Sequence, residues 1–205
     1  TLMGLNLLEA SRLAGTRRFV LISTTCAYPQ DAPIPLQEDS LWSGKPTSAT
    51  GPYGLAKRFL HEAVEQYENQ YGLDGRILIP ANLYGPGDHY GSRSHVVAAL
   101  IERYVDAQTR KVPSVTNWGD GSATREFMYV SDAASAIALA TFAESFTGPM
   151  NLGTGVETSI KDLAETISEI TNFGGETLWD TTKPTGQPRR SLNIERLKTL
   201  GFAPS

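Results

Sequence analysis

The first part of the chain alternates between helical periodicity and short, continuous apolar runs. Residues from Leu2 to Leu13 have the spacing of an amphipathic helix, and Gly15 predicts its end. Residues 18–23 follow as an apolar run whose length and β-branched side chains are typical of a buried parallel strand. Residues 28–48 are rich in Pro, Gln, Ser and Asp. They predict a long loop, and a loop of that length in a compact domain usually has a function.

A second helix and a second strand follow this loop. Pro52 is a favourable first residue for a helix, and Gly72 predicts its end. The positions that share one face of this helix are Leu60, Val64, Tyr67 and Tyr71. Residues 76–79 form the next apolar run, which Pro80 closes. The order helix, strand, loop, helix, strand is the repeating unit of a doubly wound α/β sheet.

The alternation of helical segments and apolar runs becomes less regular after residue 88. The further elements that we expect are helices over 96–107 and from a cap at Ser131 or Asp132 to Phe142, and short strands over 112–118 and 126–130 and ending at 151–153. Ser159 and Asp162 resemble a capping box ahead of another amphipathic helix. From Thr177 onward the chain is Pro-rich and basic. A single core could absorb a chain of this length, and one large domain plus a small lobe is equally allowed.

Composition narrows the class of protein. The 205 residues include 18 basic and 22 acidic side chains, a net charge of -4, and 40% are hydrophobic, which is typical of a globular protein. This balance offers no basic stripe for nucleic acid, and no apolar run reaches the roughly 20 residues of a membrane span. Cys26 is the only cysteine, so no internal disulfide forms, which fits a reducing cytoplasm.

A tyrosine and a lysine form Tyr-x-x-x-Lys at the start of the second predicted helix. The four-residue spacing places Tyr53 and Lys57 on one helical face. An ammonium close to a phenol favours the phenolate, which makes Tyr53 a candidate acid–base group with Lys57 as its tuning group. Alone, the pair is better explained as a surface tyrosine and a surface lysine on an ordinary helix.

Hydroxyl groups and a thiol come directly after the first predicted strand. Residues 23–26 read Ser-Thr-Thr-Cys. Ligands of open α/β sheets bind beyond the carboxyl ends of the strands, where a hydroxyl can donate to a substrate oxygen. The alternative is that these side chains only satisfy loop backbone groups. A strand, a hydroxyl cluster, a long loop and Tyr-x-x-x-Lys in this order are a much rarer combination than any one of them.

These motifs resemble the extended short-chain dehydrogenase/reductases, the NAD-dependent epimerase/dehydratase family. The segments that carry the resemblance are Ser-Thr-Thr-Cys-Ala-Tyr-Pro (23–29), Pro-Tyr-Gly-Leu-Ala-Lys (52–57), Asn-Leu-Tyr-Gly-Pro-Gly-Asp (82–88), Ser-His-Val-Val-Ala-Ala-Leu (94–100), Trp-Gly-Asp-Gly-Ser-Ala-Thr-Arg-Glu-Phe (118–127), Asn-Leu-Gly-Thr-Gly (151–155) and Lys-Pro-Thr-Gly-Gln-Pro-Arg-Arg (183–190). The resemblance implies a partial doubly wound parallel Rossmann-type sheet plus a small α/β substrate-binding lobe. Residues 1–88 would be the C-terminal half of a dinucleotide-binding domain. Residues 89–205 would be mainly the nucleotide-sugar lobe, with some segments returning to the sheet.

The resemblance implies an epimerase/reductase that acts on a GDP-4-keto-6-deoxyhexose with NADP or NAD as cofactor. Thr24 would hydrogen-bond the sugar ketone, Tyr53 would donate the proton for reduction, and Lys57 would tune Tyr53 and hold the nicotinamide ribose. Cys26 and His95 would exchange protons at the carbons beside the ketone, since a thiol and an imidazole both titrate near neutrality. Without the resemblance, Cys26 reads as a small buried residue and His95 as a capping or surface residue.

Binding residues follow from the same resemblance. The residues implied for the cofactor are Tyr53, Lys57, Pro80, Asn82 and Leu83, and those implied for the substrate are Asn82, Arg103, Trp118 and Arg125. Guanidinium groups suit a diphosphate because they pair bidentately with its oxygens. Arg103 and Arg125 have nearby carboxylates as alternative partners, and Trp118 packs on the base or only fills the lobe. Arg189 and Arg190 either reach the ligand or are solvated.

The sequence departs from the family at its start. The Gly-x-x-Gly-x-x-Gly turn that binds the pyrophosphate is missing, so we expect a fragment with its last helix interrupted after Ser205. The strand over 18–23 would then have an unpaired apolar edge, covered by another copy of the chain or by rearranged local structure. We also expect this polypeptide to bind NADP(H) weakly or not at all, as calorimetry would measure, and to form a homodimer.

Other functions remain open on the sequence alone. A nucleotide-sugar 4-epimerase or dehydratase of the same superfamily is one, but a simple 4-epimerase transfers a hydride at C4 and needs no pair such as Cys26 and His95. A non-catalytic nucleotide-sugar binding fragment is another. The missing glycine turn favours it, whereas Thr24, Tyr53 and Lys57 argue against it.

Overall fold

The computed structural model describes residues 1–145 and 148–204. Its elements divide into two compact units, each formed by separate stretches of chain. The stretches of unit 1 are Thr1–Ala81, Ser131–Gly155 and Leu192–Ser205, and those of unit 2 are Asn82–Val130 and Val156–Ser191.

Unit 1 is built on a parallel sheet. Its strands lie in the order β1 (Arg18–Ile22), β2 (Asp74–Pro80) and β6 (Pro149–Leu152). Ile22 pairs with Leu78 and Ile79 with Asn151, so the carboxyl ends of the strands meet at one edge. The parallel Rossmann-type sheet expected from the sequence is confirmed. Within the described residues, β1 is the end strand, and the predicted cover of its free edge stays a prediction.

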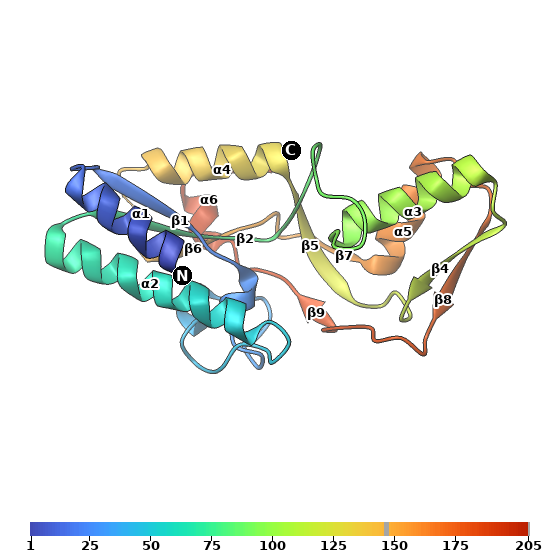
Figure 1. The fold of residues 1–205 in the computed structure, drawn as a ribbon, viewed down its shortest axis with the longest axis horizontal. Coiled ribbons are helices and arrows are strands. Elements are labelled where there is room, and N and C mark those ends of the chain that lie inside the picture. Colours follow the sequence, from blue (N-terminus) through green and yellow to red (C-terminus); the bar gives the residue numbers. More distant parts are fainter. Residues whose placement is uncertain (146–147, 205) are drawn as a thin grey trace. The chain divides into compact units, whose positions relative to one another are not determined.

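Helices cover both faces of this sheet, with α1 and α2 on one side and α4 on the other (Figure 1). The helices of unit 1 are α1 (Leu2–Leu13), α2 (Gly51–Tyr71), α4 (Val130–Phe142) and the short α6 (Glu195–Thr199). Gly72 caps α2 with a φ of 69°, a left-handed conformation that only glycine adopts without steric cost. The buried side chains between α1, α2 and the sheet are Leu8, Leu21, Leu60, Val64, Leu73 and Ile77.

The start of α4 and the end of α6 differ from those expected. We expected Ser131 or Asp132 to cap α4, but the helix begins at Val130, directly after a strand, and both residues lie in its first turn. We also expected a last helix interrupted after Ser205. Instead α6 ends at Thr199, with Leu200 as its C-cap and Gly201 at a φ of 77° just beyond, and Ser205 itself lies outside the described residues. Glycine in the left-handed region is a common helix stop.

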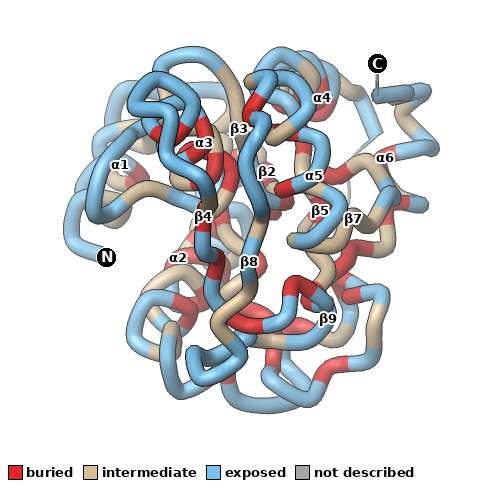
Figure 2. Tube along the Cα trace, turned by 90° about the vertical axis from the view of Figure 1, so that its right-hand side faces the viewer, coloured by how far each residue is buried: buried red, intermediate tan, exposed pale blue. Residues whose placement is uncertain are grey.

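Unit 2 contains two helices and two small sheets. Its elements are β3 (Asn82–Tyr84), α3 (Val96–Arg110), β4 (Ser114–Trp118), β5 (Thr124–Tyr129), β7 (Glu157–Ser159), α5 (Ile160–Ile170), β8 (Glu176–Asp180) and β9 (Arg189–Arg190). The strand β5 pairs with β3, β7 and β9, whereas β4 pairs in parallel with β8. Buried and exposed residues alternate along β4, because one of its faces packs on the core (Figure 2).

The core of unit 2 packs α3 and α5 against β4. Its buried residues are Leu100, Tyr104, Ala107, Val115, Ala164, Ile167 and Phe173. The Ser159 hydroxyl accepts a hydrogen bond from the Asp162 amide at 2.9 Å, which confirms the predicted start of α5. No helix within the described residues is both long and apolar enough to span a membrane.

Candidate active site

The carboxyl end of β1 leads directly into a tight turn that carries a hydroxyl and a thiol. Thr24 is the N-cap of a short 3-10 helix, η1 (Thr25–Ala27), and its Oγ1 accepts a hydrogen bond from the Cys26 amide at 3.2 Å. Both side chains are partly exposed. The turn therefore presents Thr24 and Cys26 at the sheet edge where open α/β folds bind ligands.

The first turns of α2 reach the same edge. The Lys57 ammonium donates a hydrogen bond to the Ile22 carbonyl at 2.7 Å, and Nζ lies 5.9 Å from the centre of the Tyr53 ring. Burial lowers the pKa of Lys57. Tyr53 is 52% exposed, so its phenol is accessible to a ligand. At Gly54, a Cβ would overlap the Cys26 carbonyl oxygen, which shows how closely α2 approaches the turn.

Unit 1 thus brings together four of the residues expected at the site: Thr24, Cys26, Tyr53 and Lys57. Pro80 lies at the same edge, because it ends β2 and pairs with Leu152. The Ser23 amide donates to the Leu78 carbonyl at 2.7 Å, which joins the start of the turn to β2. The arrangement can stabilise and protonate an oxygen of a bound molecule.

Unit 2 contains a pocket with a volume of about 240 Å³. The residues that line it are Asn82, Val96, Trp118, Gly121, Ala123, Arg125, Ile160 and Thr185. Trp118 is 67% exposed, so a large part of its ring is open to a ligand. The Asn82 amide donates to the Glu126 carbonyl at 2.9 Å, which ties β3 to β5. Leu83 follows on β3 and lines a second hollow, of about 170 Å³.

The charged side chain that lines this pocket is Arg125. Arg125 Nη1 donates to the carbonyls of Thr124 and Gln187, both at 2.7 Å. Desolvation and the neighbouring Arg190 charge lower the pKa of Arg125. A bound anion would offset both effects, because it would pair with a guanidinium whose charge is otherwise disfavoured.

Three other residues singled out in unit 2 do not line this pocket: His95, Arg103 and Arg189. Arg103 does not line it, and instead donates to Asn117 Oδ1 at 2.6 Å. His95 is exposed at the N-cap of α3, where its side chain makes no capping hydrogen bond. Arg189 forms an ion pair with Glu157, which holds the pKa of Glu157 at about 2. The meeting of His95 with Cys26 stays a prediction.

Sequence reasoning missed several pocket residues. Thr185 and Ile160 come from segments remote in sequence, and only the fold brings them beside Trp118. For Gly121 the Gly-Asp-Gly turn was a signal in the sequence, and the structure explains the glycine, because a φ of 75° favours that residue. No group of three or more His, Cys, Asp or Glu residues able to hold a metal is present in the part of the chain that is described.

Comparison with known proteins gives a consistent picture. The profile of the NAD dependent epimerase/dehydratase family matches residues 1–153. The chain is 36% identical to GDP-L-fucose synthase of Escherichia coli strain K12, over 96% of this chain and 64% of that protein. It is 35% identical to the probable GDP-L-fucose synthase 1 of Oryza sativa subsp. japonica, over 97% of this chain and 61% of that protein.

Solved structures of two other proteins have the same fold as this chain. A GDP-L-fucose synthetase from Naegleria fowleri, bound to NADP, matches with a TM-score of 0.94 and 27% identity, over 99% of this chain and 66% of that chain. The UDP-glucose 4-epimerase of Thermotoga maritima, with UDP-glucose, matches with a TM-score of 0.85 and 30% identity, over 98% of this chain and 63% of that chain. The chain thus spans less than two thirds of the length of these relatives.

Proposed function

Because this chain belongs to the NAD-dependent epimerase/dehydratase family, we propose that it carries the catalytic groups of a nucleotide-sugar epimerase/reductase acting on a GDP-4-keto-6-deoxyhexose. The observation that carries the proposal is the contact of Lys57 with the Ile22 carbonyl, which sets Tyr53 and Lys57 beside the turn of Thr24 and Cys26. A phenol, a hydroxyl and an ammonium at one sheet edge are suited to chemistry at a carbonyl group.

The donor set at this edge fits the nicotinamide end of NAD(P)H. Lys57 and Tyr53 offer an ammonium and a phenol for the ribose hydroxyls, while Pro80, Asn82 and Leu83 are the remaining residues that we assign to the cofactor. NAD(P)H, when bound, supplies the hydride that reduces a ketone. We propose that unit 1 corresponds to the dinucleotide-binding part and unit 2 to the nucleotide-sugar part.

The chain's own residues then have distinct roles. Thr24 donates a hydrogen bond to the ketone oxygen and Tyr53 delivers the proton to it, with Lys57 stabilising the phenolate that remains. At the carbons beside the ketone, one of Cys26 and His95 removes a proton and the other returns one to the opposite face, which inverts the centre. The ketone makes those carbons acidic enough, provided that its oxygen is held as an oxyanion.

The pocket of unit 2 supports the proposal for the nucleotide. Arg125 would pair with the diphosphate and Trp118 would stack on the base, while Arg103 would contribute positive charge from α3. The pocket volume of about 240 Å³ suits part of a nucleotide rather than the whole substrate.

Turnover of a keto sugar tests this function. The chain, fused behind a glycine-rich dinucleotide-binding segment of a relative, is given GDP-4-keto-6-deoxymannose and NADPH, and the loss of NADPH is followed. We expect consumption only with the keto sugar. We further expect Cys26→Ser and His95→Asn to abolish exchange of the sugar C–H protons with deuterated solvent while reduction is partly kept.

Two results would contradict the proposal. Interconversion of UDP-glucose and UDP-galactose without loss of NADPH would indicate a 4-epimerase instead. Calorimetric binding of GDP-sugar with no turnover of any keto sugar would indicate a non-catalytic binding fragment.

We also propose that the protein is a cytoplasmic homodimer. A cytoplasmic location fits a chain whose only cysteine is Cys26. The second copy would cover apolar side chains that are exposed on α1 and α2: Met3 at 77%, Leu7 at 53%, Leu55 at 55% and Phe59 at 51%. Their i, i+4 spacing places Met3 and Leu7 on one face of α1 and Leu55 and Phe59 on one face of α2, and we propose these two faces as the interface.

Charge on this face is expected to separate the subunits. The double variant Leu55→Glu/Phe59→Glu should sediment as a monomer at concentrations where the parent protein is a dimer, because four buried carboxylates would face one another in each pair of subunits. Ile170→Glu on α5, where the parent residue is 74% exposed, is the control and should leave sedimentation unchanged. A monomeric parent protein would refute the proposal.

A further inference from the structure

One face of α2 contacts the turn after β1 at successive helical positions. Gly54 packs under the Cys26 carbonyl and Lys57 reaches the Ile22 carbonyl. Arg58 and His61 continue this face one turn further along the helix. Neither of these two residues belongs to the groups assigned above to the reaction, yet both are buried, at 6% and 1% exposure.

Arg58 binds the C-terminal end of the turn, at Ala27. Its Nε donates to the Ala27 carbonyl at 2.6 Å, and its Nη1 donates to the Gly44 carbonyl at 2.7 Å. The guanidinium also lies over the Trp42 ring, with its carbon 5.6 Å from the ring centre. One side chain therefore fastens both the end of η1 and the loop before α2 to the helix.

His61 binds the N-terminal end of the turn, at Ser23. Its Nε2 lies 2.5 Å from the Ser23 hydroxyl, which immediately precedes Thr24. Desolvation, together with the charges of Lys57 and Arg58, lowers the pKa of His61 to about 4, so the imidazole is neutral at physiological pH. Because the Ser23 amide is bonded to the Leu78 carbonyl, the start of the turn is fixed to both β2 and α2.

We propose that Arg58 and His61 are positioning residues that clamp residues 23–27 at both ends and so set the place of Thr24 and Cys26 relative to Tyr53 and Lys57. The role in catalysis rests on the proposed function. The clamp itself rests only on the hydrogen bonds within unit 1. A clamp of this kind matters because small displacements of reacting groups slow a reaction strongly.

Alkylation of Cys26 measures the clamp without any need for activity. As the only cysteine, Cys26 is the single site for iodoacetamide. We expect His61→Leu and Arg58→Met to accelerate its alkylation about tenfold, because each frees one end of the turn for local opening. His61→Gln, whose amide can still bond the Ser23 hydroxyl, should react within about twofold of the parent protein, and Arg58→Lys should be intermediate because lysine reaches only one carbonyl.

Two controls separate the clamp from loss of stability. Glu62→Gln changes an exposed charge on the same helix and should leave alkylation unchanged. Val64→Ala removes packing at a buried residue, with 2% exposure, that forms no hydrogen bond to the turn. Denaturant is added until Val64→Ala and His61→Leu have the same free energy of unfolding, and the alkylation rates of Cys26 in the two variants are then compared. Equal rates in these two variants would overturn the proposal.

The enzymatic readout distinguishes the clamp from the proposed function. In the fused enzyme, His61→Leu should lower kcat about tenfold or more with little change in KM, and His61→Gln should restore it. Faster alkylation with an unchanged kcat would overturn the positioning role. A parent enzyme that turns over no keto sugar would refute the proposed function, while the alkylation result would still decide whether the clamp exists.

Discussion

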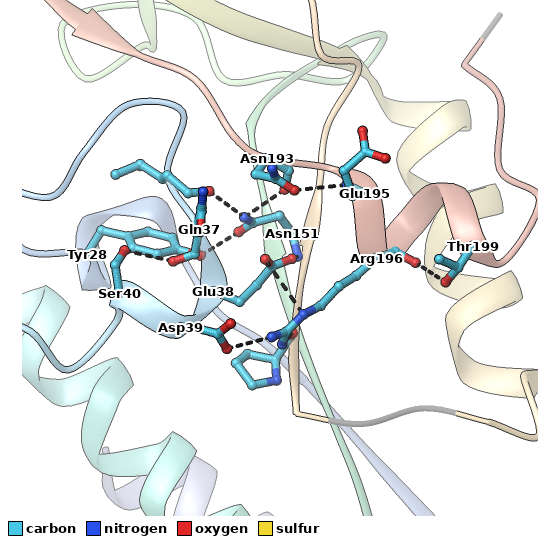
Figure 3. Close-up of polar contacts among 12 residues, drawn as sticks. Tyr28, Gln37, Glu38, Asp39, Ser40, Asn151, Asn193, Glu195, Arg196 and Thr199 are labelled. Atoms are coloured by element: carbon cyan, nitrogen blue, oxygen red, sulfur yellow. Dashed lines mark hydrogen bonds and ion pairs between the residues drawn. The ribbon is translucent and has the colours of Figure 1, made fainter.

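Replacing Asn151 with alanine is expected to lower the free energy of unfolding by about 3–4 kcal/mol. Asn151 is fully buried on β6, and its side-chain amide joins three parts of unit 1 (Figure 3). Tyr28 Oη donates to Asn151 Oδ1 at 2.7 Å, and Asn151 Nδ2 donates to the Leu36 and Asn193 carbonyls, each at 2.9 Å. The Leu36 carbonyl keeps a second donor, the Asn193 amide, in the variant. Alanine therefore leaves the Tyr28 hydroxyl and the Asn193 carbonyl unpaired.

Denaturant unfolding followed by circular dichroism measures this change. Tyr28→Phe is the matched control, because it removes one hydroxyl and leaves the other two hydrogen bonds of Asn151, so about 1 kcal/mol is expected. In the double variant, the loss of unfolding free energy should be less than the sum of the losses in Asn151→Ala and Tyr28→Phe, since the two residues bond to each other. A cost for Asn151→Ala no greater than that for Tyr28→Phe would show that the amide does not join these segments.

Lowering the pH from 7 to 5 is expected to reduce the free energy of unfolding by about 2 kcal/mol through His61 alone. The folded state holds the pKa of His61 at about 4, against an ordinary value of 6.5, because the ring is buried beside Lys57 and Arg58. Between these values only the unfolded chain takes up the proton. Stability from this residue is therefore complete above about pH 6.5, declines as the pH falls, and declines no further below about pH 4.

The His61→Gln variant isolates this effect. Its free energy of unfolding should be nearly constant between pH 7 and 5, because the glutamine side chain does not titrate in this range. Two of the carboxylates stabilised by arginines, Glu9 and Glu157, have pKa values of about 2 and titrate below this window. Parallel pH profiles for the parent protein and His61→Gln would contradict the assignment of a neutral, buried imidazole.

Much of unit 1 could be predicted from the sequence because its signals are local. The start of α2 beside Pro52 and its end before Gly72 follow from the backbone preferences of proline and glycine. Apolar runs, at residues 19–22 and 77–79, form the centres of β1 and β2, as is typical of buried parallel strands. The cluster of Thr24, Cys26, Tyr53 and Lys57 also follows from local order, since each residue lies just beyond a strand or at the start of a helix.

Unit 2 and the polar contacts of the interior were harder to predict. The strand β8 lies in a stretch that reads as Pro-rich and basic, and its pairing with β4 is a long-range contact without a sequence signal. The same holds for Tyr28 and Asn151, whose contact joins residues 123 positions apart. The start of α4 at Val130 was missed because a serine and an aspartate suggested a cap, whereas the preceding strand continues directly into the helix.

The discontinuous make-up of unit 1 has a consequence for synthesis on the ribosome. The strand β2, with Ile77, Leu78 and Ile79 at 0–3% exposure in the folded state, emerges well before β6, its neighbour in the sheet. The whole stretch from Asn82 to Val130 is translated between the two strands. A nascent chain therefore carries an open apolar strand edge during this interval, which is a state prone to intermolecular pairing. Slow translation across residues 82–130 is accordingly expected to favour misassembly of unit 1.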